Sequence, residues 1–301
     1  MTGPETVDIC ICTYRRDHLA ETLQTVLAQD LPEGLTARII VADNDTDPSA
    51  QPVVEDAGAG APMPVTYVHA PARNISIARN ACLDAATGDW VAFIDDDEIA
   101  PPDWIATLWQ AARDTGADVM FGPAIAIYPA GTPDWIVAED YHTNRVPMHD
   151  GQVSTGHTCN VLMRWHGSVI AGERYRLENG RTGGEDVEFF FRLSRLGCVM
   201  GNCDAAAVSE HTGAGRLSYR WLRQRKFAAG QFHGAYAEAD GGSLAHRLKL
   251  LAGSGAKAVL CFALAAVFLW HQPRRNRWAI RAWLHLGVCA SALGIGLAEL
   301  Y

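Results

Sequence analysis

Four acidic residues in a row are the part of this chain whose types and spacing are best suited to chemistry. Residues 91–94 are apolar and predict a buried strand, and directly after them come Asp95, Asp96, Asp97 and Glu98. Neighbouring carboxylates repel one another, so each needs a raised pKa or a bound cation at a packed strand end. Oxygen ligands that leave room for water and phosphate suit Mg²⁺ or Mn²⁺. The alternative interpretation is a solvated acidic turn, which is how most charged runs occur.

A second pair of carboxylates stands at the start of a predicted helix. Glu185 and Asp186 follow two glycines and open the helical pattern of residues 185–193. Acids at a helix start also complement the helix dipole, which explains them without any chemistry. In a catalytic site, one of the two can act as the general base that deprotonates an attacking hydroxyl.

A sheet has to position these groups, and the chain predicts one. Apolar segments at residues 7–12, 37–42, 65–69 and 90–94 have the composition of strands, and they alternate with helical segments. Ligands of such domains collect at the carboxyl ends of the parallel strands, where polar clusters stand in this chain. We therefore predict a Rossmann-like α/β domain with a mainly parallel sheet that binds a nucleotide.

The polar residues after the first three strands each have two interpretations. Residues 13–16 form a loop that contacts a nucleotide or simply caps a turn. Asp43 can accept a hydrogen bond from a base or a ribose hydroxyl, although Asx-rich turns are common. Arg73 and Arg79 bring positive charge toward a diphosphate, or they lie on the surface.

Composition argues against some classes of function and indicates the cellular compartment. The chain has 301 residues and a formal net charge of −9, which argues against general nucleic-acid binding. Its 8 cysteines lack the spacing of a zinc site, so we predict reduced core residues in a cytosolic compartment. The first residues show no basic start followed by an apolar region, and we therefore expect no secretory signal.

Five short motifs, taken in order, resemble the family 2 glycosyltransferases of the GT-A fold. They occupy residues 12–16, 41–44, 78–80, 93–98 and 183–186, and the resemblance covers roughly the first two thirds of the chain. Each motif alone is permissive, whereas the five in this order are specific. Within the family, the chain looks most like the bacterial enzymes that build succinoglycan-type exopolysaccharides.

On the donor side, the resemblance implies a UDP-sugar site with a divalent metal, Mn²⁺ or Mg²⁺. The nucleotide would be bound by Thr13, Tyr14, Arg15, Asp43, Arg73 and Arg79. Asp97 would be the direct metal ligand, with Asp95 as a second one. Asp95 and Asp96 would also face the ribose or the donor sugar, and Glu98 would be the solvated end of the motif. His211, which ends another apolar strand, is a further candidate metal ligand, with a structural histidine as the alternative.

On the acceptor side, the resemblance assigns the catalytic base to Asp186 and the positioning of the acceptor to Glu185. Asn160, in the apolar segment 159–163, would line the same side. One departure from the family is the ending Asp-Asn-Asp at residues 43–45, where many members have two consecutive aspartates and then Gly-Ser. That departure leaves Asp43 credible and makes Asp45 a weaker candidate.

The middle of the chain gives weaker signals. Residues 118–128 predict a strand that is irregular at Gly122 and Pro123. Residues 129–158 are rich in Pro, Asp, His and Gly without any period, so we predict a mobile loop over the site. The basic, aromatic helix of residues 218–227 lacks the Gln-x-x-Arg-Trp signature of processive members of the family, which favours the addition of one sugar.

The C-terminal part contains two apolar stretches, residues 250–270 and 282–298, each of borderline length for a membrane span. Basic residues flank the first on both sides, so the positive-inside rule does not predict its orientation. We predict a helical hairpin that lies in or dips into the cytoplasmic leaflet. Two true spans, or packing of both helices on the catalytic domain or on a second copy, are the alternatives.

The sequence therefore predicts a GT-A catalytic domain over residues 1–240 and a membrane-associated hairpin over residues 241–301. Within the first, the nucleotide part extends to about residue 128 and the acceptor part covers about 129–240.

The predicted activity is metal-dependent, inverting transfer of a single sugar from a UDP-sugar, with UDP-glucose as a candidate, to a lipid-linked saccharide. It would serve exopolysaccharide or cell-envelope glycan synthesis at the cytoplasmic face of the inner membrane. A nucleotidyltransferase and a non-catalytic membrane scaffold of the same fold are the alternatives.

Overall fold

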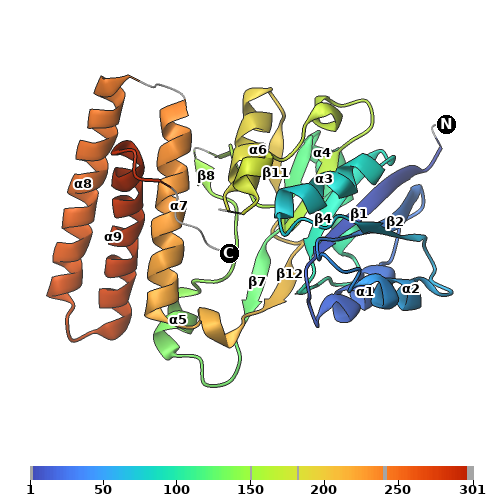
Figure 1. The fold of residues 1–301 in the computed structure, drawn as a ribbon, viewed down its shortest axis with the longest axis horizontal. Helices are drawn as coiled ribbons and strands as arrows, with labels where there is room; N and C mark the ends of the chain where they lie inside the picture. The colour runs from blue at the N-terminus through green and yellow to red at the C-terminus, as the bar shows by residue number, and fades with distance from the viewer. Residues whose placement is uncertain (1–2, 150, 182, 240–242, 297–301) are drawn as a thin grey trace. The chain divides into compact units, whose positions relative to one another are not determined.

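Residues 3–149, 151–181, 183–239 and 243–296 are described by the computed structural model in Figure 1. The chain divides into two units, each built from segments that are distant in sequence. The sheet unit comprises Met1–Ala126, Thr143–Arg181 and Glu185–His211, and the helical unit comprises Ile127–His142, Thr182–Gly184 and Thr212–Tyr301.

The sheet unit is organised by seven strands in the order β11-β6-β10-β4-β1-β2-β3. Their bounds are β1 (Glu5–Thr13), β2 (Leu35–Asp43), β3 (Val65–His69), β4 (Trp90–Asp95), β6 (Val119–Phe121), β10 (Asn160–Arg164) and β11 (Met200–Asn202). Strand β10 runs antiparallel to β4 and β6, and the other pairs are parallel. The prediction of a mainly parallel sheet is confirmed.

The register of the central strands brings the polar strand ends together. Thr13 stands opposite Asp43 on β2, and Cys12 stands opposite Asp95 on β4. Because parallel strands end at the same edge of the sheet, the loops that follow β1, β2 and β4 are neighbours.

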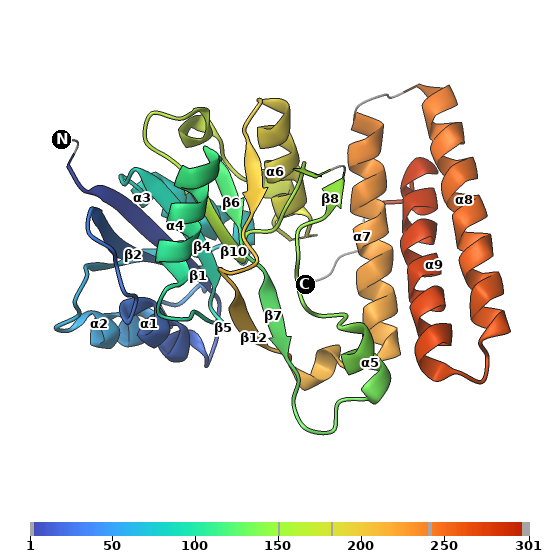
Figure 2. The ribbon, with the colours of Figure 1, turned by 180° about the vertical axis from the view of Figure 1, so that it is seen from behind.

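Two layers of helices cover the sheet because successive side chains of each strand point to opposite faces. On β1, the residues Val7, Ile9 and Ile11 pack with α1 (Leu19–Leu27), α2 (Gln51–Gly58) and α4 (Trp104–Thr115). Cys10, between them in sequence, packs with α3 (Ile75–Ala85) and α6 (Glu185–Arg195) on the other face. Figure 1 shows α1 and α2 on one side of the strands and α3 on the other, and Figure 2 shows α4 from behind.

A second, three-stranded sheet follows the order β5-β12-β7, with β5 (Glu98–Ile99), β12 (Val208–His211) and β7 (Ala124–Ile127). The predicted irregularity at Gly122 and Pro123 is confirmed, because β6 ends before these residues and β7 begins after them in the other sheet. Short 3₁₀ helices at Val169–Gly172, Leu177–Asn179 and Ala214–Arg216 form parts of the connections.

The prediction that residues 129–158 form one long loop is wrong, and its mobility stays a prediction. This stretch contains the helix α5 (Asp134–Glu139) and a hairpin of β8 (Met148–His149) with β9 (Gln152–Val153). Trp135 and Ile136 on α5 are buried and pack with Leu222 and Ile280 of the same unit. A helix of 6 residues is too short to show a helical period in sequence, so only its packing reveals it.

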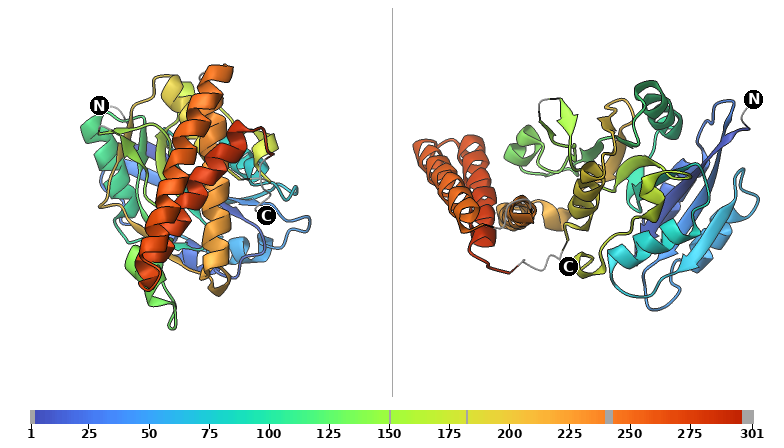
Figure 3. Two further views of the ribbon diagram at one scale, coloured as in Figure 1. Left: turned by 90° about the vertical axis from the view of Figure 1, so that its left-hand side faces the viewer. Right: turned by 90° about the horizontal axis from the view of Figure 1, so that it is seen from above.

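The described residues of the helical unit form three long helices, α7 (Tyr219–Ala239), α8 (Leu244–Val267) and α9 (Gln272–Ala292). Helix α9 lies between α7 and α8, as Figures 1 and 2 show and as the colours in Figure 3 confirm from above. Close packing requires glycine at Gly287, since a side chain there would collide with the Phe227 carbonyl oxygen and with Gly230. Both sides of α9 are thus covered by protein.

Helix α8 differs from α9 in what it leaves uncovered. A stripe of small side chains at helical spacing is buried, and it consists of Ser254, Ala258, Cys261 and Ala265. Large apolar side chains elsewhere on the helix are exposed, among them Leu248, Val259, Leu260 and Val267. Among the described residues, α8 is the one helix long and apolar enough to cross a membrane. The alternative of two spanning helices is therefore not supported, and the predicted domain boundary near residue 240 stays a prediction.

Candidate active site

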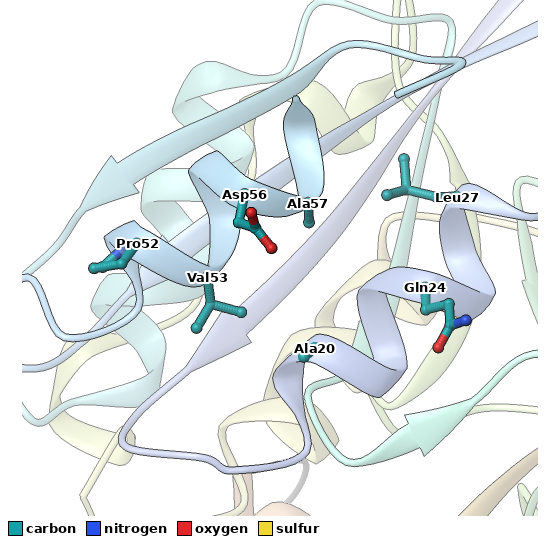
Figure 4. Close-up of a pocket in the computed structure, with 7 residues that line it drawn as sticks. All are labelled: Ala20, Gln24, Leu27, Pro52, Val53, Asp56 and Ala57. Atoms are coloured by element: carbon teal, nitrogen blue, oxygen red, sulfur yellow. The ribbon is translucent and has the colours of Figure 1, made fainter. Parts of the chain in front are cut away.

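A cavity of about 610 Å³ opens where β1 and β2 end. Its walls come from the loop after β1, from the loop after β2, and from the starts of α1 and α2, and they include Thr13, Arg15, Arg16, Asp45 and Ser49. The structure therefore places two predicted nucleotide contacts, Thr13 and Arg15, in one hollow. A second cavity of similar size lies between α1 and α2, shown in Figure 4, and carries none of the predicted site residues.

Tyr14 is flanked by two arginines. The guanidinium carbons of Arg15 and Arg73 lie 5.5 and 5.7 Å from the centre of its ring. Both arginines have positive backbone φ angles, of 53° and 48°, which non-glycine residues adopt rarely and at a cost. Tyr14 as a residue is 36% exposed. An exposed aromatic side chain with two cations nearby suits a nucleotide, whose base can stack and whose phosphates carry negative charge.

Asp43 is wholly buried, and its carboxylate oxygens already accept hydrogen bonds from the protein. Its two oxygens accept hydrogen bonds from the backbone N–H groups of Asp45 and Ala50 and from the Tyr67 hydroxyl, at 2.8 to 3.0 Å. Asp45 pairs with Arg15 at 2.7 Å, and this guanidinium holds the pKa of the Asp45 carboxyl well below its usual range. In this structure both aspartates organise the loop, and a direct nucleotide contact by Asp43 stays a prediction.

The acidic run at the end of β4 is strongly perturbed. Burial raises the pKa of Asp95 to about 7, with Arg79 opposing the rise and the charges of Asp97 and Asp96 adding to it. Burial raises the pKa of Asp96 to about 6, opposed by the Thr13 hydroxyl and by Arg16. Arg16 lies 3.5 Å from an Asp96 oxygen and 3.6 Å from an Asp97 oxygen. Arg16 thus acts as a counterion for the acidic run. This role was not predicted from the sequence, and the only signal for it is that Arg16 belongs to the first motif.

The expectation that Glu98 is the solvated end of the motif is wrong. Its side chain is fully buried, and Oε2 accepts the backbone N–H of Asp95 at 2.8 Å. Burial raises the pKa of Glu98 well above its usual range. Glu98 begins β5 and stands opposite Glu210 on β12, so sheet pairing draws it inward. The side chain closes the turn that presents Asp95, Asp96 and Asp97.

Within the part of the chain that the structure describes, one group of side chains could hold a metal ion. Oxygen or sulfur atoms of Asp95, Glu98 and Cys159 all lie within 4.8 Å of one another. Glu98 Oε1 is buried without a hydrogen-bond partner among the described residues, which fits a place for a cation. Of the predicted ligands, this group contains Asp95. The group does not contain the other two predicted ligands. Asp97 lies two residues after Asp95 in sequence, and His211 is exposed and stacks on His18 with 6.0 Å between the ring centres.

The carboxylates at the start of α6 are joined to α3 by an ion pair. Arg79 Nη1 lies 2.5 Å from Glu185 Oε1, and both side chains are buried. Burial raises the pKa of Glu185, and Arg79 opposes that rise. Asp186 is less buried, and its Oδ1 accepts the N–H of Val187 at 2.7 Å. Two carboxylates therefore stand side by side in sequence, one fixed by a cation and the other more open to solvent.

Asn160, expected on the acceptor side, is a structural residue. It is fully buried, and its amide nitrogen donates to the carbonyl oxygens of Pro123 and Ala206. Its amide oxygen accepts from Trp104 Nε1 at 2.9 Å. These bonds connect β10 to α4 and to the segments that precede β7 and β12, and they leave no part of the side chain for an acceptor.

The fold and the site together define an α/β protein with a mainly parallel sheet, an acidic strand end and a carboxylate pair at a helix start. The sequence model of Glycosyl transferase family 2 matches residues 8–165, slightly more than half of the chain. The chain is 41% identical over 298 residues to the Succinoglycan biosynthesis protein ExoM of Rhizobium meliloti (strain 1021), covering 98% of this chain and 95% of that protein.

Solved structures agree in fold. The Mannosyltransferase PcManGT from Pyrobaculum calidifontis, in complex with GDP-Man and Mn²⁺, superposes with a TM-score of 0.65 at 19% identity, covering 96% of this chain and 88% of that one. S. aureus TarS 1–349 in complex with UDP-GlcNAc gives a TM-score of 0.53 at 15% identity, covering 96% and 92%. The chain belongs to glycosyl transferase family 2: it is a glycosyltransferase with the GT-A fold, as the motifs predicted.

The raised pKa values predict how stability depends on pH. The pKa of Asp95 is about 7 and that of Asp96 about 6 in the folded protein, against 3.8 for the free group. The folded state therefore binds these protons more tightly than the unfolded chain, so their stabilising contribution is complete below about pH 4 and is lost as the pH rises through 6 to 7.

We expect the unfolding temperature of the wild type, in a chelator, to fall more between about pH 5 and about pH 8 than that of Asp95→Asn, which cannot ionise at this position. Thermal unfolding followed by fluorescence measures both slopes. Parallel slopes would show that Asp95 is ionised throughout.

Proposed function

We propose that the protein transfers a single sugar from a UDP-sugar, with UDP-glucose as a candidate, to a lipid-linked saccharide during exopolysaccharide or cell-envelope glycan synthesis. The observation that carries this proposal is the presence in one unit of two carboxylate groups with different roles. One is the buried acidic run at the end of β4, and the other is the Glu185 and Asp186 pair at the start of α6. The identity of 41% to a succinoglycan biosynthesis protein over nearly the whole chain supports the glycan class.

On the donor side, the first loop supplies the nucleotide contacts. Tyr14 offers an aromatic face, and Arg15 and Arg73 beside it offer charge to the nucleotide. Asp97 and Asp95 would hold Mn²⁺ or Mg²⁺, which when bound neutralises the diphosphate leaving group. Glu98 and Arg16 keep the acidic turn in place for this task.

On the acceptor side, Asp186 takes the proton of the acceptor hydroxyl as that oxygen attacks C1 of the sugar. The new C–O bond forms while the bond from C1 to the diphosphate oxygen breaks, and UDP leaves with the electron pair. Attack opposite the leaving group inverts the configuration at C1. Glu185, fixed by Arg79, positions the acceptor.

Helix α8 supports the part of this proposal that places the protein at a membrane. Its exposed large apolar side chains include Val259 at 70% and Leu260 at 58%, and Trp270 just after the helix is 88% exposed. Exposed leucine, valine and tryptophan side chains along one helix are typical of contact with lipid. Because α9 is covered on both sides, the proposed contact uses α8 rather than both helices of the hairpin.

Substitution of an aspartate in either carboxylate group should strongly lower the transfer rate. We expect Asp186→Asn to lower the transfer rate by about 10² to 10⁴-fold while UDP binding in Mn²⁺ is kept, because the variant loses only a general base. Asp97→Ala should lower both transfer and Mn²⁺-dependent UDP binding. Calorimetry with UDP and a UDP-release assay measure the two effects.

The matched control is Asp204→Asn, a carboxylate whose side chain is 74% exposed in the turn after β11. It should behave as the wild type. Transfer at the wild-type rate by Asp97→Ala or Asp186→Asn would refute the role assigned to that residue. Diphosphate released from a nucleoside triphosphate would favour nucleotidyl transfer instead.

The exposed face of α8 should decide membrane binding. We expect Val259→Gln/Leu260→Gln to lower co-sedimentation with phosphatidylglycerol-containing vesicles several-fold, since it removes two exposed apolar side chains. Leu196→Gln/Val199→Gln is the control, because these residues are 46% and 55% exposed in the sheet unit. Equal sedimentation of both variants, or a wild type that stays in solution, would contradict the assignment.

A further inference from the structure

Arg79 has a role that differs from the one its motif suggests. We propose that Arg79 is a positioning residue that fixes the acceptor carboxylates, and that it does not bind the donor diphosphate. The inference rests on the proposed function, since it assigns a residue to one side of that reaction.

The surroundings of Arg79 are those of an internal counterion. The residue is 7% exposed, and its guanidinium is paired with the buried Glu185. Its guanidinium carbon lies 5.3 Å from the ring centre of Tyr175, which is itself buried. A side chain held between a carboxylate and an aromatic ring would have to abandon both to reach a ligand. Arg73, by contrast, lies on an exposed loop beside Tyr14.

Hydrogen bonds from α3 hold the segment that leads into α6. Asn80 Nδ2 donates to the carbonyl oxygen of Tyr175, and the Tyr175 N–H donates to Asn80 Oδ1, both at 2.8 Å. Asn74, which caps α3, donates to the carbonyl oxygen of Leu177 at 2.9 Å. Arg79 stands on the same helix, between these two asparagines. Its ion pair with Glu185 therefore adds to these hydrogen bonds. Together they fix the position of the start of α6 relative to α3.

The charges around Arg79 explain why a cation is needed there. The titratable groups that act on it are Glu185, Tyr175, Asp186 and Asp95, from α6, from the segment before it and from β4. Glu185 Oε2 is buried without a hydrogen-bond partner among the described residues, so Arg79 is the main compensation for this carboxylate. Loss of the guanidinium would leave a buried charge unpaired beside Asp186. The expected consequence is a displaced or protonated Glu185 and a badly placed base.

The experiment compares two arginines in two assays. For Arg79→Gln we expect transfer to the acceptor to fall by about 100-fold through kcat, while the Kd for UDP in Mn²⁺ changes by less than about threefold. For Arg73→Gln we expect the UDP Kd to rise about tenfold, because an exposed contact to the donor is lost. Arg79→Lys should recover part of the transfer rate, because it restores the charge without the planar fork.

The double variant Arg79→Gln/Glu185→Gln adds a test of coupling. It should be no slower than Arg79→Gln alone, because the two residues act as one unit. A rise of tenfold or more in the UDP Kd of Arg79→Gln would overturn the inference and return Arg79 to the donor site. If that variant does not fold, Arg79→Lys decides by the same criterion. A wild type that neither binds UDP nor consumes a UDP-sugar would refute the proposed function itself.

Discussion

The burial of several carboxylates near the end of one strand is the constraint on which the rest of the site depends. Asp96 and Glu98 are buried at the end of β4 and Asp95 is half-buried there, and the loss of solvent raises the pKa of each. Such a group of like charges is stable only with protons or cations close by. The chain supplies one such cation itself, Arg16 from the loop after β1, which pairs with Asp96 and Asp97. Asp95 and Glu98, with Cys159, lie close enough together to hold a divalent ion as a second one.

This requirement connects parts that are distant in sequence. Arg16 is bound to the acidic turn, so the nucleotide loop and the strand end are held together. Arg79 is bound to Glu185, so α3 fixes the start of the helix that carries Asp186. The loop after β1, the acidic turn and the start of α6 are thus held in place by ion pairs. The proposed reaction needs such an arrangement, because the attacking hydroxyl and the leaving diphosphate must be aligned on one sugar carbon.

Local patterns predicted the fold of the sheet unit, the order of its central strands in sequence and the two acidic groups, because each depends on a short run of residues. Partnerships across the fold could not be predicted. Glu98 ends an acidic run, and only its pairing opposite Glu210 in a second sheet buries it. Asp43 turns inward to two N–H groups of the loop that follows it and to the Tyr67 hydroxyl of β3, and Asn160 bonds to the segments that precede β7 and β12. The exposed face of α8 could not be predicted either, because it depends on which side of α8 packs against α9.

The central claim is that the acidic strand end holds a metal-dependent UDP-sugar site. The most direct measurement is UDP release by the full chain from a panel of UDP-sugars, with Mn²⁺, with Mg²⁺ and with a chelator. The account predicts release from a UDP-sugar that depends on the divalent ion and stops in the chelator. Release that is unchanged by chelation, or diphosphate released from a nucleoside triphosphate in place of UDP, would contradict it.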